Sequence, residues 1–333
     1  MVRASGLGGY EALMRALGHD PGPLLRRYRI QPQTLADEDA LLPLRAVLQL
    51  LEASAAQTGC GDFGLRLARI QDITVLGPVA LAMQHASTVA DALDIASRYL
   101  FVHSPGMRLT LHPRSQFMPG TAEVRFEIHA PGAGSQRQAI DICLGDVHHI
   151  LEFLAGGAYG LKAVTLPHTP VAPLTTYSRF YGVPVHPAQD YGGLHFRADA
   201  LDMGLHSVNT ALRQITEAYL ATHFGGPEQS VAARTRQALQ RTLGTSGGSK
   251  ASVARVLGMH PRTLQRHLVA EQTSFEAQRD TLRRELAQRY LQETGIPMAQ
   301  LAGLLGLSEQ SALSRACRRW FGQSPSQLRR GGR

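Results

Sequence analysis

Two stretches near the C-terminal end of the chain read ARVLGMHPRTLQRHL, residues 254–268, and AGLLGLSEQSALSRAC, residues 302–317. Aligning them from their first alanine places Leu257–Gly258 on Leu305–Gly306, so the chain contains an internal repeat. In each copy a helical segment stops at the glycine, which adopts a left-handed conformation at little cost. An apolar residue and a short turn follow, and then a second helix begins. Each copy therefore predicts a helix-turn-helix unit.

The second helix of each unit is predicted to have an apolar inner face and a polar outer face. In the first copy Pro261 suits the first helical position, and Leu264 and Leu268 share the inner face. In the second copy Ser308 is expected to cap the helix, and Leu313 points inward. The outward side chains are of types that bind guanine and adenine edges or phosphates. They are Arg262, Gln265 and Arg266 in the first copy, and Gln310, Ser311, Ser314 and Arg315 in the second, which Arg318 and Arg319 extend.

A further helix is predicted between the two units. The motif Thr273-Ser274-Phe275-Glu276 has the form of a capping box, in which Thr273 would start the helix and Glu276 would complete the cap. Apolar residues such as Leu282 fall on its inner face, and Gly295 and Pro297 end it. A helix of about 18 residues is a rigid spacer of about 27 Å. We therefore expect the two units to be held at a fixed separation.

Charge is unevenly distributed along the 333 residues, which carry a formal net charge of +8. Residues 226–333 hold 17 Lys and Arg against 7 Asp and Glu, whereas residues 1–225 hold 17 against 19. Only Lys162 and Lys250 are lysines, and arginine has the planar guanidinium that binds phosphates and guanine edges. A GC-rich genome also raises arginine content, but that bias would not gather the positive charge in one domain. The C-terminal region is therefore predicted to bind a polyanion.

The first 225 residues predict a mixed α+β domain. Apolar residues recur at helical spacing up to about Arg69, which indicates three or four helices, and helical segments continue over residues 75–85 and 89–102. Residues 107–112 and 124–128 alternate apolar and polar side chains, as paired strands do. The pattern then predicts a long helix over residues 136–154 and short strands near residues 163–166, 183–186 and 194–196.

A Gly-rich junction at Gly225 and Gly226 is the predicted boundary between a domain of residues 1–225 and an all-α domain of residues 226–333. Directly before it, apolar side chains follow one another at 4-3-4 spacing, the seam of a packed or paired helix. Such a seam predicts either a contact between two copies of the chain or packing of the helix on its own domain. The seam residues are Val208, Leu212, Ile215 and Tyr219.

The order helix-turn-helix, linking helix, helix-turn-helix, ending in LSRACRRWFGQSPSQLRR, resembles the DNA-binding domain of the AraC/XylS transcription regulators over about residues 229–330. By resemblance, the base-reading positions are the outward residues of the two second helices named above. The sequence departs from the family at Leu307, Leu313 and Cys317, where larger aromatic residues are usual, and at His260, a capping position that is commonly Ser. The family's pattern in the second unit is matched by Ala302, Gly306, Ser311, Ser314, Arg315, Gly322, Ser324 and Pro325.

Residues 1–225 are similar to the arabinose-binding-like effector and dimerisation domain that a subset of this family carries, with matches such as LGPVALAMQHASTVADAL and FYGVPV. The resemblance implies an α+β effector domain followed by an all-α DNA-binding domain with two helix-turn-helix units joined by a linking helix. It implies promoter or operator DNA, a small-molecule effector, RNA polymerase and a second copy of the chain as partners. Four polar residues beside apolar helical faces could line an effector pocket or be ordinary interior and surface positions. They are Arg98, Tyr99, His103 and His148.

No metal, cofactor or catalytic residue is predicted. The three cysteines are isolated, which argues against a disulfide framework or a Cys-based zinc site and suits a reducing compartment. His148 and His149 are adjacent in a helix and point about 100° apart, so they cannot chelate one metal together. Cys60 lies in TGCGDFG with no preceding strand and no paired histidine, which favours a structural thiol over a nucleophile.

The chain has neither an apolar N-terminal h-region nor a run of 18 apolar residues, so we expect a cytoplasmic protein that does not span a membrane. The predicted function is a ligand-responsive, sequence-specific transcription regulator and not an enzyme. One alternative is an enzyme fused to a DNA-binding domain, although no Gly-rich phosphate loop or acid–base motif stands out. The other is an architectural binder, which would show little preference over competitor DNA.

Overall fold

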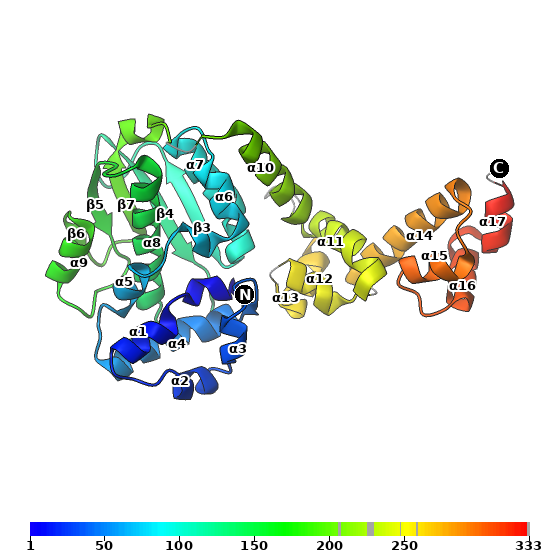
Figure 1. Ribbon diagram of the computed structural model, residues 1–333, viewed down its shortest axis with the longest axis horizontal. Helices are drawn as coiled ribbons and strands as arrows, with labels where there is room; N and C mark the ends of the chain where they lie inside the picture. Colours follow the sequence, from blue (N-terminus) through cyan, green and yellow to red (C-terminus); the bar gives the residue numbers. More distant parts are fainter. Residues whose placement is uncertain (206–207, 225–229, 247, 258, 332–333) are drawn as a thin grey trace. The chain divides into compact units, whose positions relative to one another are not determined.

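Figure 1 shows the computed structural model of the chain, which describes every residue except 206–207, 225–229, 247, 258 and 332–333. The chain divides into two compact units, Met1–Leu220 and Ala221–Arg333. The predicted boundary at Gly225 and Gly226 and the predicted turn at Gly258 lie outside the described residues.

The first 69 residues of the N-terminal unit are mainly helical, as the apolar spacing predicts, and bury Tyr10, Leu48 and Phe63 in one cluster. Five α-helices are present where three or four were expected, because the shortest has four residues, too few for an apolar period to show. A pair of two-residue antiparallel strands was not predicted for the same reason. The elements are β1 (Val2–Arg3), η1 (Ala4–Leu7), α1 (Tyr10–Ala16), α2 (Gly22–Arg27), α3 (Pro32–Leu35), β2 (Leu41–Leu42), α4 (Leu44–Thr58) and α5 (Phe63–Ala68).

Two helical segments then lead to the sheet. The first is a short turn, η2 (Ile73–Leu76), capped by the Asp72 carboxylate and followed directly by α6 (Pro78–Gln84). The second is α7 (Val89–His103), where the Thr88 hydroxyl accepts a hydrogen bond of 3.1 Å from the Asp91 backbone N–H. Both lie close to the predicted segments, because caps and turns are local features of sequence.

A five-stranded sheet in the order β3-β4-β7-β5-β6 forms the other layer. Its neighbours are antiparallel except β5 and β6, which run parallel. Helix α8 (Arg137–Ala155) packs against α4, α5 and two central strands, so this unit is the predicted α+β fold (Figure 1). The remaining elements are β3 (Met107–His112), β4 (Thr121–Ile128), β5 (Leu161–Thr165), α9 (Leu174–Tyr181), β6 (Val185–His186), β7 (Gly192–Arg197) and η3 (Ala198–Asp202).

Helix α10 (Thr210–Phe224) carries three of the four residues of the predicted apolar seam, Val208 precedes it, and the seam is exposed. Val208, Leu212, Ile215 and Tyr219 are 39 to 66% exposed, so the expectation that the seam packs on its own domain is wrong. Polar contacts join Arg213 of this helix to residues earlier in the N-terminal unit. Arg213 donates to Ser87 Oγ at 3.2 Å and lies 3.4 Å from Asp91.

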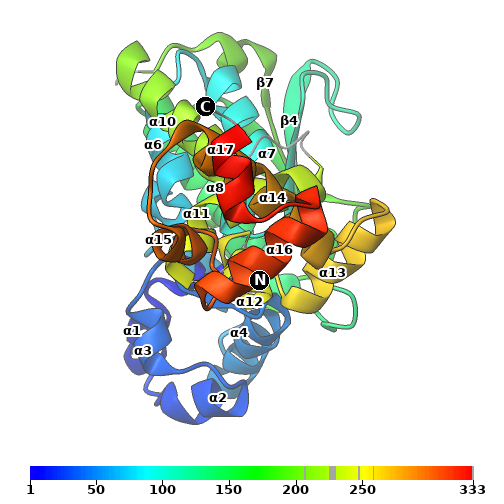
Figure 2. The same ribbon diagram turned by 90° about the vertical axis from the view of Figure 1, so that its right-hand side faces the viewer.

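Among its described residues, the C-terminal unit contains helices and no strand, as predicted. One cluster of buried side chains runs through it from Ala238 to Cys317 and includes the inner faces of both predicted units. Figure 2 shows α16 and α17 lying in front of α14, which both contact. The helices are α11 (Val231–Ser246), α12 (Lys250–Val256), α13 (Pro261–Ala270), α14 (Phe275–Glu293), α15 (Met298–Leu304), α16 (Gln310–Phe321) and α17 (Pro325–Gly331).

In the part of the chain that the structure describes, no helix combines the length and apolar character needed to cross a membrane.

Candidate nucleic-acid interface

The first helix-turn-helix unit consists of α12, a turn and α13. His260 is the N-cap of α13, and its Nδ1 accepts a hydrogen bond of 3.2 Å from the Arg262 backbone N–H. His260 therefore caps this helix through its side chain, a role that serine commonly has. Pro261 occupies the first turn, and Leu264 and Leu268 are fully buried, so the predicted inner face is confirmed.

The outer face of α13 presents two exposed guanidinium groups and one amide. Arg262 and Arg266 are exposed, whereas Gln265 is partly buried. The Gln265 Oε1 atom accepts a hydrogen bond of 2.9 Å from Lys250 Nζ on α12, which also lies 5.9 Å from the Phe275 ring centre. This bond orients the amide and leaves its NH₂ group to donate, as an adenine N7 requires.

The second unit consists of α15, a turn and α16. Gly306 has φ = 60°, the left-handed conformation predicted for the turn, and Leu313 is fully buried. The N-cap of α16 is Glu309, and its side chain makes no capping bond, so the prediction that Ser308 caps this helix is wrong. The helix starts one residue later than the sequence pattern suggests. The Glu309 carboxylate instead accepts a hydrogen bond from the Ser311 hydroxyl.

The outer face of α16 is polar, as predicted, but its Arg315 already contacts other side chains of the same unit. Gln310, Ser311 and Arg315 are exposed, and Ser314 is partly buried. Arg315 donates to Ser311 Oγ at 3.2 Å and lies 3.5 Å from the Glu309 carboxylate. The Ser311 hydroxyl, followed by the Arg315 guanidinium, holds the pKa of Glu309 below its usual range. An acidic group therefore lies beside the residues expected to meet DNA.

The two arginines near the C-terminal end of α16, Arg318 and Arg319, lie in different environments. Arg318 is exposed. Arg319 forms an ion pair with Asp280 of α14 and lies 5.6 Å from the Trp320 ring centre. Trp320 Nε1 donates to the same carboxylate at 2.8 Å. Asp280 therefore fixes the C-terminal half of α16 on the linking helix.

The linking helix α14 begins one residue later than the predicted capping box requires. Its N-cap is Ser274, whose hydroxyl accepts a hydrogen bond of 3.1 Å from the Ala277 backbone N–H. The predicted Thr273–Glu276 box is therefore wrong. Thr273 Oγ1 accepts from Gln278 instead, and Glu276 pairs with Arg279. The 19 residues of α14 span about 28 Å, close to the predicted length.

Arg283, in the middle of α14, was not predicted to have a role. Its guanidinium donates to the backbone carbonyls of Leu305 at 2.8 Å and Gly306 at 2.7 Å. These carbonyls end α15, where backbone acceptors lack helical partners. Burial lowers the pKa of Arg283, which is consistent with a partly enclosed charge. The linking helix is therefore bonded directly to the turn of the second unit.

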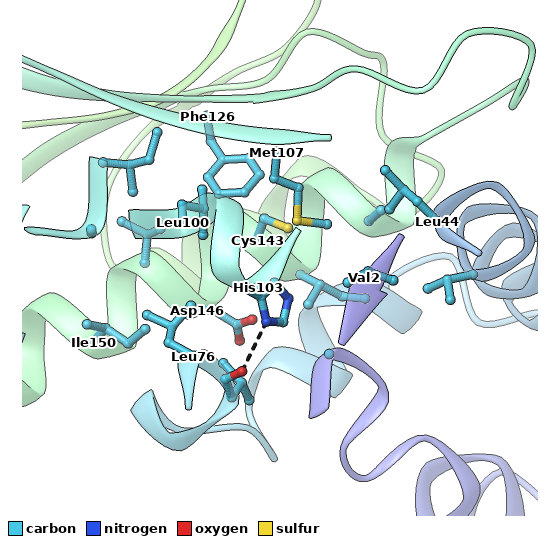
Figure 3. A pocket seen from close by; sticks show the side chains of 18 of the residues that line it. Val2, Leu44, Leu76, Leu100, His103, Met107, Phe126, Cys143, Asp146 and Ile150 are labelled. Carbon is cyan, nitrogen blue, oxygen red and sulfur yellow. Dashed lines mark hydrogen bonds between the residues drawn. The ribbon is translucent and has the colours of Figure 1, made fainter. Parts of the chain in front are cut away.

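In the N-terminal unit, an apolar cavity of about 70 Å³ lies among α4, α7, α8 and the sheet (Figure 3). Of the four predicted effector residues, His103 lines it, whereas Arg98, Tyr99 and His148 do not belong to its described lining. Arg98 is exposed and pairs with Asp94, and Tyr99 is buried elsewhere in the core. The His148 Nδ1 atom lies 3.0 Å from the Tyr159 hydroxyl.

Asp146 also lines the cavity and was missed. It falls between Cys143 and Ile150 at helical spacing, so an acidic residue interrupts an apolar stripe of α8. That interruption is the signal that sequence analysis could have used.

A buried polar network connects three strands of the sheet. His195 Nε2 lies 3.2 Å from Thr165 Oγ1, and Nδ1 lies 3.3 Å from Glu123. The order hydroxyl, imidazole, carboxylate is that of a nucleophile with its base. All three side chains are fully buried, however, so the network crosslinks the sheet and is closed to a substrate.

The thiol that the sequence offered as a possible nucleophile is likewise in a structural position. Cys60 is buried, and burial, with the nearby Asp62 carboxyl, raises the pKa of its thiol to about 11, which makes it a poor nucleophile. Within the described residues, no group of three or more His, Cys, Asp or Glu side chains is arranged to hold a metal ion.

The matches to known families fall separately in the two compact units of the chain. Residues 18–205 match the arabinose-binding domain found at the N-terminus of AraC transcription regulators. Residues 253–331 match a helix-turn-helix domain, and residues 234–268 also match the Fis family of bacterial regulatory proteins.

The relatives found are named as regulators. The HTH-type transcriptional regulator VirS of Mycobacterium tuberculosis is 36% identical over 99% of this chain and 96% of its own length. The ornithine utilization regulator of Pseudomonas aeruginosa is 26% identical over 90% of this chain and 88% of its own. Among solved structures, the transcriptional regulator CdpR from Pseudomonas aeruginosa aligns over 93% of this chain and 96% of its own, with 23% identity and a TM-score of 0.46.

Proposed function

The chain belongs to the AraC/XylS family of DNA-binding transcription regulators, and from this we propose that it reads two short operator boxes under the control of a small-molecule effector. The observation that carries the proposal is the presence of two exposed polar helix faces, on α13 and α16, over one shared core. Helix α14 joins the two units, and its Arg283 donates hydrogen bonds to the turn of the second unit. The two polar faces are therefore held by one rigid domain.

The proposed roles follow from side-chain chemistry. Arg262, Arg266 and Arg315 carry the planar fork that bonds guanine O6 and N7, and Gln265 and Gln310 carry the amide that bonds adenine. Ser311 and Ser314 are short donors that suit either a base edge or a phosphate. Arg318 and Arg319, at the end of α16, are proposed to bind phosphates.

A selection of bound sequences from random DNA, using the full chain, tests this function. We expect two enriched boxes and an affinity that falls steeply with salt as counterions are released. An Arg262→Ala/Arg266→Ala/Arg315→Ala variant should lose the enrichment. An Arg26→Ala/Arg27→Ala/Arg15→Ala variant, which removes as much charge from the N-terminal unit, should keep it. Binding without enrichment of any sequence would favour an architectural binder instead.

We also propose that two copies of the chain pair through the exposed seam of α10. The seam presents Leu212, Ile215 and Tyr219 along one face, and large apolar side chains in a contiguous stripe mark an interaction surface. Ile215→Glu should yield a monomer in sedimentation, whereas Leu81→Glu, at an apolar side chain exposed elsewhere, should leave the dimer intact. A wild-type chain that stays monomeric at high concentration would contradict the pairing.

The N-terminal unit is proposed to bind its effector without turning it over, and the regulator to act in the cytoplasm, with RNA polymerase as the target of activation or exclusion. Effector control predicts that a metabolite which raises the melting temperature of the full chain also changes its affinity for the selected operator. A metabolite that is chemically converted by the purified chain would instead support the enzyme alternative.

A further inference from the structure

The cavity of the N-terminal unit is lined almost entirely by hydrocarbon side chains. Leu44 comes from α4, Leu100 from α7, Phe126 from β4 and Ile150 from α8 (Figure 3). Two polar side chains interrupt this lining, His103 and Asp146, and Figure 3 shows them close together on neighbouring helices. An apolar pocket with a few converging polar groups is the usual form of a small-molecule site.

Asp146 is the less satisfied of the two. Among the residues that the structure describes, its buried Oδ1 atom has no hydrogen-bond partner. Burial raises the pKa of this carboxyl well above its usual range, since no cation compensates its charge. The Arg3 guanidinium, whose charge acts on His103, pairs with Asp39 and does not belong to the described lining. A buried carboxyl oxygen without a hydrogen-bond partner destabilises the empty protein. A ligand that donates a hydrogen bond to this oxygen removes that cost, which favours binding.

The tautomer of His103 follows from its hydrogen bond to the Val75 backbone. Its Nδ1 lies 3.1 Å from the Val75 carbonyl oxygen, which can only accept, so Nδ1 carries the proton (Figure 3). Burial, with the charge of Arg3 adding to it, lowers the pKa of His103 to about 4, so the ring is neutral near pH 7 and Nε2 is an acceptor. Both polar groups of the cavity can therefore accept hydrogen bonds from a ligand.

We propose that this cavity binds a small apolar primary amine, whose ammonium group donates to Asp146 and to His103 Nε2 while its hydrocarbon body fills the apolar lining. The raised pKa keeps the proton on the Asp146 carboxyl of the empty cavity, so an amine that enters takes up this proton and the pair becomes an ammonium and a carboxylate. The ammonium has three donors and a positive charge, so it satisfies both acceptors and neutralises the carboxylate. A hydroxyl donates once and does not take up the Asp146 proton, and a carboxylate would bring a negative charge into an apolar lining that contains no lysine or arginine among its described residues. This assignment rests on the proposed effector function and names the chemistry of the effector.

The size of the cavity limits the hydrocarbon. About 70 Å³ is roughly half the volume of a cavity that takes benzene, so the body must be short or the lining must adjust. Met83 and Met107 both contact the cavity, and methionine side chains repack at little cost. A chain of about six carbons fits only when these side chains repack, so it is a probe that also tests whether the lining adjusts.

The test compares n-hexylamine, n-hexanol and hexanoate by calorimetry with the full chain near neutral pH. We expect n-hexylamine to bind at least about tenfold more tightly than n-hexanol, and hexanoate to bind most weakly. Asp146→Asn, which keeps the shape of the side chain, should remove the preference for the amine and leave n-hexanol binding within about twofold. Asp94→Asn, at an exposed carboxylate of α7, should change nothing. Equal binding of the amine and the alcohol, or a preference that survives Asp146→Asn, would overturn the proposal.

A second measurement avoids dependence on any variant. With ¹³C-labelled methionine methyl groups, n-hexylamine should shift the resonances of Met83 and Met107 in the wild-type chain and leave Met14, buried in the core outside the lining, in place. Shifts confined to other methionines would place the amine elsewhere and refute the assignment.

Neither measurement uses DNA, so the two proposals can fail separately. If the cavity rejects n-hexylamine but another metabolite alters operator binding, the amine assignment is wrong and the regulator function stands. If the chain selects no DNA sequence but binds n-hexylamine through Asp146, the regulator function is wrong and the cavity chemistry stands.

Discussion

The two helix-turn-helix units share one core but hold their outward arginines differently. Among the described residues, neither Arg262 nor Arg266 of α13 forms an ion pair. In α16, Arg315 pairs with Glu309, and Arg319 pairs with Asp280. The first unit therefore offers its cations directly, whereas Arg315 and Arg319 of the second unit must exchange acidic partners for DNA.

This difference suggests a division of labour. Exposed ion pairs contribute little to stability, so exchanging them costs little when a base or phosphate replaces the acid. The Glu309 carboxylate beside α16 also repels the phosphates of a DNA sequence that makes no compensating hydrogen bond. This repulsion increases the difference in affinity between matching and non-matching sequences. We therefore expect α13 to supply more of the affinity and α16 more of the discrimination between sequences.

The largest expected effect concerns the spacing of the two boxes. Because α14 and the shared core fix the two units, inserting about five base pairs between the boxes turns the second box to the opposite DNA face. Binding both would then require bending that costs several kcal/mol, so affinity should fall at least about 100-fold in gel-shift titrations. Inserting a full helical turn of DNA should restore little of the affinity, since the linking helix α14 spans only about 28 Å. Changing the spacer sequence at constant length is the control, and undiminished affinity with both insertions would show that one unit acts alone.

The next effect tests whether the two units are one folding body. Leu264→Ala and Leu313→Ala each remove a fully buried side chain from the same cluster, one in each unit. Each should lower the free energy of unfolding by about 2 to 5 kcal/mol. Both should shift the same melting transition of the C-terminal unit. Val269→Ala, at a side chain 60% exposed, is the control and should change stability little. Two separately shifted transitions would mean that the units fold independently.

Single arginine changes should separate the two units on DNA. Arg266→Ala and Arg315→Ala should each lower discrimination by about 1 to 3 kcal/mol, at different boxes, as measured by competition between operator variants. Arg266→Ala should also reduce overall affinity more, because it has no acidic partner to release. A loss that is uniform over all sequences would identify the arginine as a phosphate contact.

The smallest expected effect comes from the acidic residue beside α16. Glu309→Gln should strengthen DNA binding by about two- to fivefold at low salt, because Arg315 no longer has to leave a carboxylate. Discrimination at the second box should fall at the same time. Glu293→Gln, at an exposed position at the end of α14, is the matched control. Weaker binding by Glu309→Gln would show that Glu309 orients Arg315 and does not compete with DNA.

Prediction from sequence succeeded where a pattern repeats along the chain. Alternation located β3, and the helical stripe located α8 to within one residue at each end. It failed at single ends and in short elements. Ser308 and Thr273 are good capping residues, but each helix begins one residue later than these caps would allow. The β1–β2 pair has two residues in each strand, which leaves no period to detect.

The sequence by itself determined the repeat, the placement of positive charge and the inward position of Leu264 and Leu313, because helical spacing is a local property of the chain. Only the tertiary structure decided which polar groups meet across elements. Arg283 reaches a turn 22 residues away, and Asp146 of α8 comes to lie close to His103 of α7 in the lining of an apolar cavity. Such contacts depend on how helices pack and on which rotamers that packing allows. A pattern read along one helix shows that a side chain points inward, but not what it meets there.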